Sequence, residues 1–66
     1  MEITVNDARR EVADGVSLLS LLDLLHLPPA ATVVELNGQV LDRIRYPEVV
    51  LAPNDALELV RFVGGG

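Results

Sequence analysis

The hydrophobic and polar positions of this chain change their period several times, and each period predicts a different element. Over residues 2–6 apolar side chains alternate with polar ones, which is the period-two pattern of a strand with one wet face. Turn-forming side chains follow at Asn6 and Asp7, and residues 9–12 are expected to return as the antiparallel partner. Residues 56–63 alternate again. We therefore expect a hairpin near the start of the chain and its clearest strand at the end.

Residues 18–26 show the period of a helix instead. Four leucines at the spacing i, i+3, i+4, i+7 cover one face: Leu18, Leu21, Leu22 and Leu25. Ser17 stands where an N-cap belongs, and its hydroxyl is able to accept from a free backbone N–H group of the first turn. Pro28 and Pro29 are expected to end the helix, because proline lacks the N–H donor and restricts the residue before it.

The remaining segments predict a few more short strands. Residues 33–37 are rich in β-branched side chains and lead into an Asn-Gly turn, with residues 39–41 as a brief partner. Residues 42–47 are charged and predicted to be irregular, and residues 48–51 are predicted to form another short strand. The sum is an α+β domain, with a mixed sheet of four to five strands packed on one main helix. Its core is expected to join the helical leucines to Ile3, Val5, Leu57 and Leu59.

Composition limits what such a domain does. The chain has 66 residues, enough for one small domain, and lacks cysteine and lysine. Ten acidic residues against five arginines leave a formal charge of −5, which repels phosphate backbones and anionic lipids. We expect no nucleic acid and no membrane as partners, but a neutral or basic protein surface. Four of the five arginines, at residues 9, 10, 43 and 45, with Tyr46 beside the last, are expected to form surface salt bridges and not a nucleic-acid patch.

The residues needed for catalysis by the chain itself are sparse. There is one histidine, His26, at the expected helix end, where an imidazolium favours the helix dipole, and the two serines have no obvious base nearby. No catalytic residue and no metal ligand is assigned, so the chain is not expected to be an enzyme. Its first residues lack the basic and apolar leader of an exported protein, and we expect a cytoplasmic location.

Three glycines close the sequence, at Gly64, Gly65 and Gly66. A phosphate-binding glycine loop needs a helix after it, so that function is excluded here. The glycines could be a linker remnant. Alternatively, a thread without Cβ atoms fits a narrow channel through which another enzyme reaches the terminal carboxylate. We accordingly divide the chain into a folded domain, residues 1–63, and a flexible glycine tail, residues 64–66.

The chain resembles the ThiS family of β-grasp sulfur carriers, which are related to the molybdopterin carrier and more distantly to ubiquitin. The resemblance covers nearly the whole chain. It is carried by Ile3-Thr4-Val5-Asn6, Gly15-Val16-Ser17-Leu18, Leu21-Leu22, Val34-Glu35-Leu36-Asn37-Gly38, Asn54-Asp55 and Val60-Arg61-Phe62-Val63-Gly64-Gly65-Gly66. It implies a ubiquitin-like fold in which the carrier supplies a reactive terminus and partner enzymes supply the catalysis.

The resemblance further implies a sulfur relay at Gly66. An adenylating enzyme of the ThiF or MoeB kind uses ATP to activate the Gly66 carboxylate, while the carrier itself binds no cofactor. A sulfur donor, such as a cysteine desulfurase relay, then forms a thiocarboxylate that a thiazole synthase of the ThiG kind consumes in thiamine biosynthesis. Gly64 and Gly65 enter the partner's active site. Val60 and Phe62 are the candidates for partner contact, although Phe62 could equally belong to the core.

Three alternatives remain open from the sequence. The same thiocarboxylate could serve molybdopterin, amino-acid or transfer-RNA sulfuration. The chain could instead be a ubiquitin-like modifier that forms isopeptide bonds through Gly66. It could also be a plain interaction module with a passive tail, and deletion of Gly66 separates this last alternative from the other two.

Overall fold

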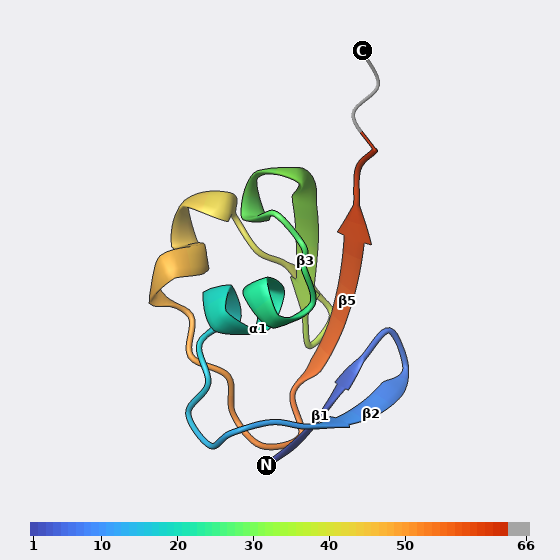
Figure 1. Ribbon diagram of the computed structural model, residues 1–66, viewed down its shortest axis with the longest axis vertical. Helices are drawn as coiled ribbons and strands as arrows, with labels where there is room; N and C mark the ends of the chain where they lie inside the picture. The colour runs from blue at the N-terminus through green and yellow to red at the C-terminus, as the bar shows by residue number, and fades with distance from the viewer. Residues whose placement is uncertain (64–66) are drawn as a thin grey trace.

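A five-stranded mixed sheet with one main helix forms the body of the protein in a computed structural model, which describes residues 1–63 (Figure 1). The strands lie in the order β2-β1-β5-β3-β4, with β1 and β5 parallel and the other neighbours antiparallel. In chain order the elements are β1 (Glu2–Val5), β2 (Ala8–Glu11), α1 (Leu18–Leu24), the 3-10 helix η1 (Pro29–Ala31), β3 (Thr32–Leu36), β4 (Gln39–Val40), the 3-10 helix η2 (Arg43–Glu48) and β5 (Ala56–Arg61). The predicted α+β class, helix and mixed sheet are confirmed.

Two tight turns set the registers of the outer strands. Asn6 and Asp7 both have positive φ, 50° and 68°, and connect β1 to β2. Asn37 and Gly38 do the same between β3 and β4, with φ values of 50° and 84°. Two successive residues with positive φ match the twist of the strands that they join, and Asn, Asp and Gly tolerate this conformation. The turn residues that predicted the two hairpins in the sequence are therefore the residues that form the turns.

The core lies between α1 and one face of the sheet, as expected. Its buried hydrophobic residues are Ile3, Val5, Leu18, Leu21, Leu22, Val34, Tyr46, Leu51, Leu57 and Leu59. Leu25, the fourth leucine of the predicted helical stripe, is only partly buried and packs against this cluster. In Figure 1 α1 and η2 lie together on one side of the β3–β5 pair. The opposite face of these two strands is therefore left to solvent.

The ends of α1 follow different chemistry. Ser17 is the predicted N-cap, and its Oγ accepts from the Ser20 backbone N–H at 3.0 Å. The helix stops at Leu24, earlier than expected, and the prolines do not end it. His26 has a φ of 58° and donates its N–H to Asp23 O at 3.0 Å, while Leu27 donates to Leu22 O at 2.8 Å. This pair of bonds is a Schellman motif, which closes the helix before Pro28 is reached.

The segment between β4 and β5 differs from expectation. Residues 42–47 were predicted to be irregular, yet η2 runs from Arg43 to Glu48, and Asp42 caps it by accepting from the Ile44 N–H at 3.2 Å. The strand predicted at residues 48–51 is wrong, because only a single bridge between Ser17 and Val50 forms there. The reason is that the side chain of Tyr46, which is 2% exposed, packs in the core, and the segment around it forms η2.

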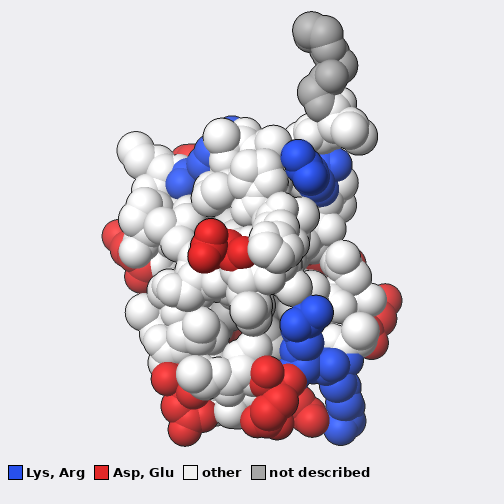
Figure 2. Space-filling model, viewed as in Figure 1, with Lys and Arg blue, Asp and Glu red and all other residues white. Residues whose placement is uncertain are grey.

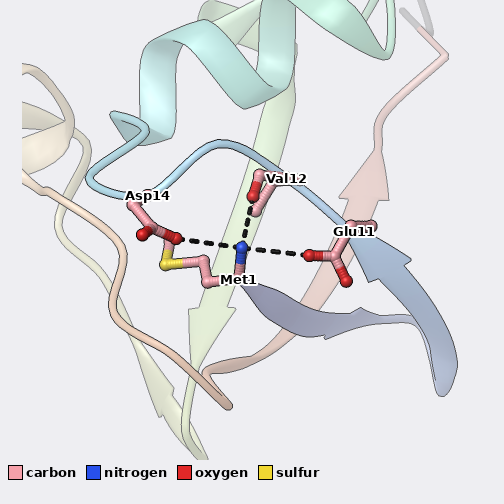
Figure 3. Close-up of polar contacts among 4 residues, drawn as sticks. All are labelled: Met1, Glu11, Val12 and Asp14. Atoms are coloured by element: carbon pink, nitrogen blue, oxygen red, sulfur yellow. Dashed lines mark hydrogen bonds and ion pairs between the residues drawn. The ribbon is translucent and has the colours of Figure 1, made fainter.

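The amino group of Met1 is held by three acceptors (Figure 3). It donates to Val12 O at 2.7 Å and forms ion pairs with Glu11 Oε2 at 3.1 Å and Asp14 Oδ1 at 3.0 Å. The hydrogen bonds that the Met1 amino group donates to Asp14, and then to Glu11, raise its pKa above the ordinary value of 8.0. This contact ties the start of β1 to the segment that leads from β2 into α1.

Candidate functional site

The candidate site is the end of β5, the strand that leads to the glycine tail. β5 occupies the centre of the sheet, with β1 on one side and β3 on the other. The side chain of Asn6 bonds to its backbone twice: Asn6 Oδ1 accepts from Leu59 N at 2.8 Å, and Asn6 Nδ2 donates to Leu59 O at 3.3 Å. At the start of the strand, Ala56 N donates to Asn37 Oδ1 at 2.9 Å. These contacts hold β5 along its length, so the tail begins from a fixed strand.

The last described residues leave the body of the protein exposed. Phe62 N donates to Ala31 O at 2.8 Å, which extends the backbone pairing one residue past β5. Val60 is 55% exposed, Phe62 59% and Val63 90%. The alternative that Phe62 belongs to the core is therefore wrong, and both candidate contact residues are accessible to a partner. The proposed reactive residue Gly66, with Gly64 and Gly65, lies outside the described residues.

The solvent face of the sheet beside this exit carries a defined set of side chains. Strand register places Val33 opposite Val60, Glu35 opposite Glu58, and Glu35 also beside Val40 on β4. We call these five residues the outer patch. Val40, Glu58 and Val60 are exposed, whereas Val33 and Glu35 are half-buried. The sequence linked Glu58 with Val60 through their alternation, but Glu35 was missed because only the β3–β5 register brings it to Glu58.

The opposite side of the molecule offers little chemistry. An open hollow of about 480 Å³ lies at the end of α1, lined by Leu19, Asp23, His26, Leu27, Pro28 and Pro29. Ser17 Oγ donates to Ser20 Oγ at 2.9 Å, and no histidine takes part in that bond. Among residues 1–63 no group of His, Cys, Asp and Glu is arranged to hold a metal ion. In the same part of the chain, no helix is long and apolar enough to cross a membrane.

Two of the four arginines predicted to form surface salt bridges do so within residues 1–63, whereas Arg43 donates to the backbone of Pro29. Arg9 pairs with Glu2 at 3.1 Å and Arg45 with Glu48 at 2.7 Å. Tyr46, which was weighed as part of a nucleic-acid patch, is buried and presents no aromatic face for a base. On the face drawn in Figure 2, acidic side chains gather at the end of the molecule remote from the end of β5, and basic side chains lie both beside them and near the end of β5. Charges of both signs are therefore mixed on this face.

Comparison with known proteins agrees with this geometry. The model of the ThiS family matches residues 1–66. The chain belongs to the ThiS family. Over 53 residues, 80% of each chain, it is 38% identical to the sulfur carrier protein ThiS of Bacillus subtilis. The crystal structure of a thiamine biosynthesis protein, ThiS, from Geobacter metallireducens superimposes with a TM-score of 0.83 at 36% identity, covering both chains completely. The fold is thus the β-grasp fold of this family.

The family also matches a segment of larger proteins. All 66 residues align with a thiazole synthase of Magnetococcus marinus at 38% identity, and with one of Paramagnetospirillum magneticum at 29%. The chain spans only 20% of the length of each of these two relatives. ThiS-family sequence therefore occurs both as a small protein and within longer chains.

Proposed function

We propose that this protein is a sulfur carrier in thiamine biosynthesis, and that Gly66 carries the sulfur as a thiocarboxylate. The observation that carries the proposal is the ThiS family match to all 66 residues, through the three glycines. The exposed end of β5 supports it, because Phe62 and Val63 lead the chain away from the body at the point where the tail starts. The folded domain then serves as a docking body, and it supplies no catalytic group of its own.

The chemistry of the relay explains why a bare carboxylate needs a partner. A carboxylate is a poor electrophile. In the proposed reaction, an oxygen of the Gly66 carboxylate attacks the α-phosphorus of ATP and pyrophosphate leaves, which gives an acyl-adenylate. The outer sulfur of a persulfide donor then attacks the acyl carbon and AMP leaves with the electron pair of the broken bond, which gives an acyl disulfide. A thiol attacks the donor's sulfur of that disulfide, forms a new disulfide with it and so releases the thiocarboxylate. ATP therefore belongs to the adenylating enzyme, and the carrier needs no bound cofactor.

The proposed partners follow from these steps. An adenylating enzyme of the ThiF or MoeB kind acts first, a cysteine desulfurase relay supplies sulfur, and a thiazole synthase of the ThiG kind consumes the thiocarboxylate. The two thiazole synthases that contain a ThiS-like segment support the last partner, because they link such sequence with thiazole formation. A cytoplasmic location is part of the proposal, since ATP and reduced sulfur donors are available there.

Intact mass spectrometry tests the proposal directly. The protein is incubated with the adenylating enzyme, ATP and a sulfur source, and is then weighed whole. We expect a gain equal to the mass difference between sulfur and oxygen, located at Gly66. The mass of the unreacted protein also checks that Gly66 is its last residue, which the chemistry requires.

The controls separate the alternatives. A variant that lacks Gly66, and a reaction without ATP, are both expected to show no gain. A ladder of larger conjugates on a gel would identify a modifier instead. If the thiocarboxylate forms but thiazole synthase does not use it, the acceptor lies in another sulfuration pathway. Absence of any mass gain with the active adenylating enzyme would disprove the carrier function.

A further inference from the structure

The outer patch sets two carboxylates against each other on the solvent face of the sheet. Glu35 on β3 and Glu58 on β5 are directly opposite in the antiparallel register. Like charges at directly opposed positions destabilise a sheet. Within residues 1–63 neither carboxylate forms an ion pair, whereas Glu2 and Glu48 each pair with an arginine of the same chain. The folded protein therefore retains a repulsive pair at the centre of its sheet.

Apolar side chains surround this acidic pair. Val33 and Val60 form the next cross-strand pair along the same two strands, and Val40 lies beside Glu35. Val40 is 70% exposed and Val60 55%. Phe62 continues the alternation of Glu58 and Val60 toward the tail and is 59% exposed. Such a surface fits a partner with apolar side chains around a guanidinium or ammonium group, because a cation there removes the repulsion.

The position of the patch indicates which partner this is. Gly66 is the fourth residue after Phe62. Even a fully extended chain of that length spans at most about 14 Å. An enzyme that acts on the Gly66 carboxylate must therefore bring its active site within that distance of Phe62, which places its surface against the end of the patch.

We infer that the outer patch is the docking surface for the adenylating enzyme, and that an arginine or lysine of that enzyme lies between Glu35 and Glu58. The inference rests on the proposed function. It explains why an opposed acidic pair stays uncompensated within the folded chain: the compensating charge comes with the partner. Glu35 and Glu58 then lower the stability of the free carrier and raise its affinity for the enzyme.

Removing these charges should therefore change stability and affinity in opposite directions. In Glu58→Gln and in the double variant E35Q/E58Q, we expect the urea midpoint of the free protein to rise by about 0.2–1 M, because the repulsion is relieved. The Kd for the adenylating enzyme, measured by titration calorimetry at low salt, is expected to rise about five- to tenfold in the double variant. The affinity of the double variant should also fall less steeply with added salt than the affinity of the wild-type protein does.

A matched control carries the same change in net charge. Asp23 and Glu48 are both exposed, on α1 and on η2, which lie together on the side of the β3–β5 pair opposite the outer patch (Figure 1). The double variant D23N/E48Q is expected to keep the wild-type Kd. Equal weakening in the control and in E35Q/E58Q would attribute the effect to net charge and overturn the inference, as would an unchanged Kd in E35Q/E58Q.

The outcomes also separate this inference from the proposed function. Wild-type protein that binds the enzyme through these residues without being thiocarboxylated contradicts the carrier chemistry and supports the docking surface. If E35Q/E58Q is thiocarboxylated as efficiently as the wild-type protein at limiting carrier concentration, the docking surface is contradicted and the carrier chemistry stands. Wild-type protein that does not bind the enzyme at all overturns the inference.

Discussion

The hydroxyl of Tyr46 ties η2 to β3 from inside the core. It accepts from Val34 N at 3.1 Å and donates to Thr32 O at 2.9 Å, and the Tyr46 side chain is almost fully buried. One side chain thereby satisfies two backbone groups that water does not reach. This explains why a charged and proline-containing segment is ordered against the sheet.

Replacement of Tyr46 by Phe keeps the ring and removes the hydroxyl. We expect the free energy of unfolding to fall by about 1–3 kcal/mol, because a buried N–H and a buried C=O lose their partner. Urea unfolding measures the change. Asp23→Asn on the exposed side of α1 is the surface control and is expected to stay within about 0.5 kcal/mol of wild type. A similarly small effect of Tyr46→Phe would show that the two backbone groups find other partners.

The Met1 amino group gives stability a defined dependence on pH. Its pKa is raised in the folded protein by Asp14 and Glu11, so the folded state binds this proton more tightly than the unfolded chain does. The stabilisation is fully present below the ordinary value of 8.0 and is lost as pH rises through the raised pKa.

We therefore expect the free energy of unfolding to decrease as pH rises from 8.0 through the raised pKa of the amino group, and to decrease less in Asp14→Asn. Urea unfolding at several pH values, with both proteins compared at each pH, isolates the contribution of this group. Parallel curves for the two proteins would mean that the ion pair does not persist in solution.

Strands and helix were predictable from sequence where a local pattern alone decides them. The alternation before Asn6, the leucine spacing of α1 and the Asn-Gly turn at Gly38 each specify backbone geometry within a few residues. The segment of residues 42–51 was not predictable in the same way, because its course depends on a distant contact between Tyr46 and β3. The end of α1 was misread because the positive φ of His26, and not Pro28, closes the helix.

His26 is therefore a test of how α1 ends. A residue with a side chain pays about 1–2 kcal/mol in the left-handed conformation, and glycine avoids this but loses more chain entropy on folding. We expect His26→Gly to stabilise the protein by about 0.5–1 kcal/mol, as judged from urea unfolding. His26→Ala, which keeps the steric cost, should not stabilise it. A less stable glycine variant would show that the imidazole contributes more than the backbone strain costs.

At the scale of the whole molecule, the proposed function divides the chain into a folded docking body, residues 1–63, and a short reactive tail, residues 64–66. Sequence placed Val60 and Phe62 on one face of β5 through the alternation of that strand, and the structure shows that both are exposed. It did not predict that Glu35 joins them, because the pairing of β3 with β5 follows from topology and not from local pattern. Part of the outer patch could thus be predicted from the sequence, but Glu35 could not.

This separation predicts that body and tail act independently on the adenylating enzyme. A chain that stops at Val63 keeps β5, Phe62 and the outer patch but has no glycine tail, so it should bind the enzyme without being converted. We expect it to inhibit thiocarboxylation of the full-length protein competitively, raising the apparent KM while leaving kcat unchanged.

The same truncation combined with E35Q/E58Q provides the control, and this variant should inhibit about five- to tenfold less strongly. Steady-state rates at several concentrations of each truncated chain give both inhibition constants. If the truncated chain does not inhibit even in large excess, then the tail provides most of the affinity. The folded body would in that case fix the direction in which the tail leaves, and the enzyme would recognise the protein by its glycines.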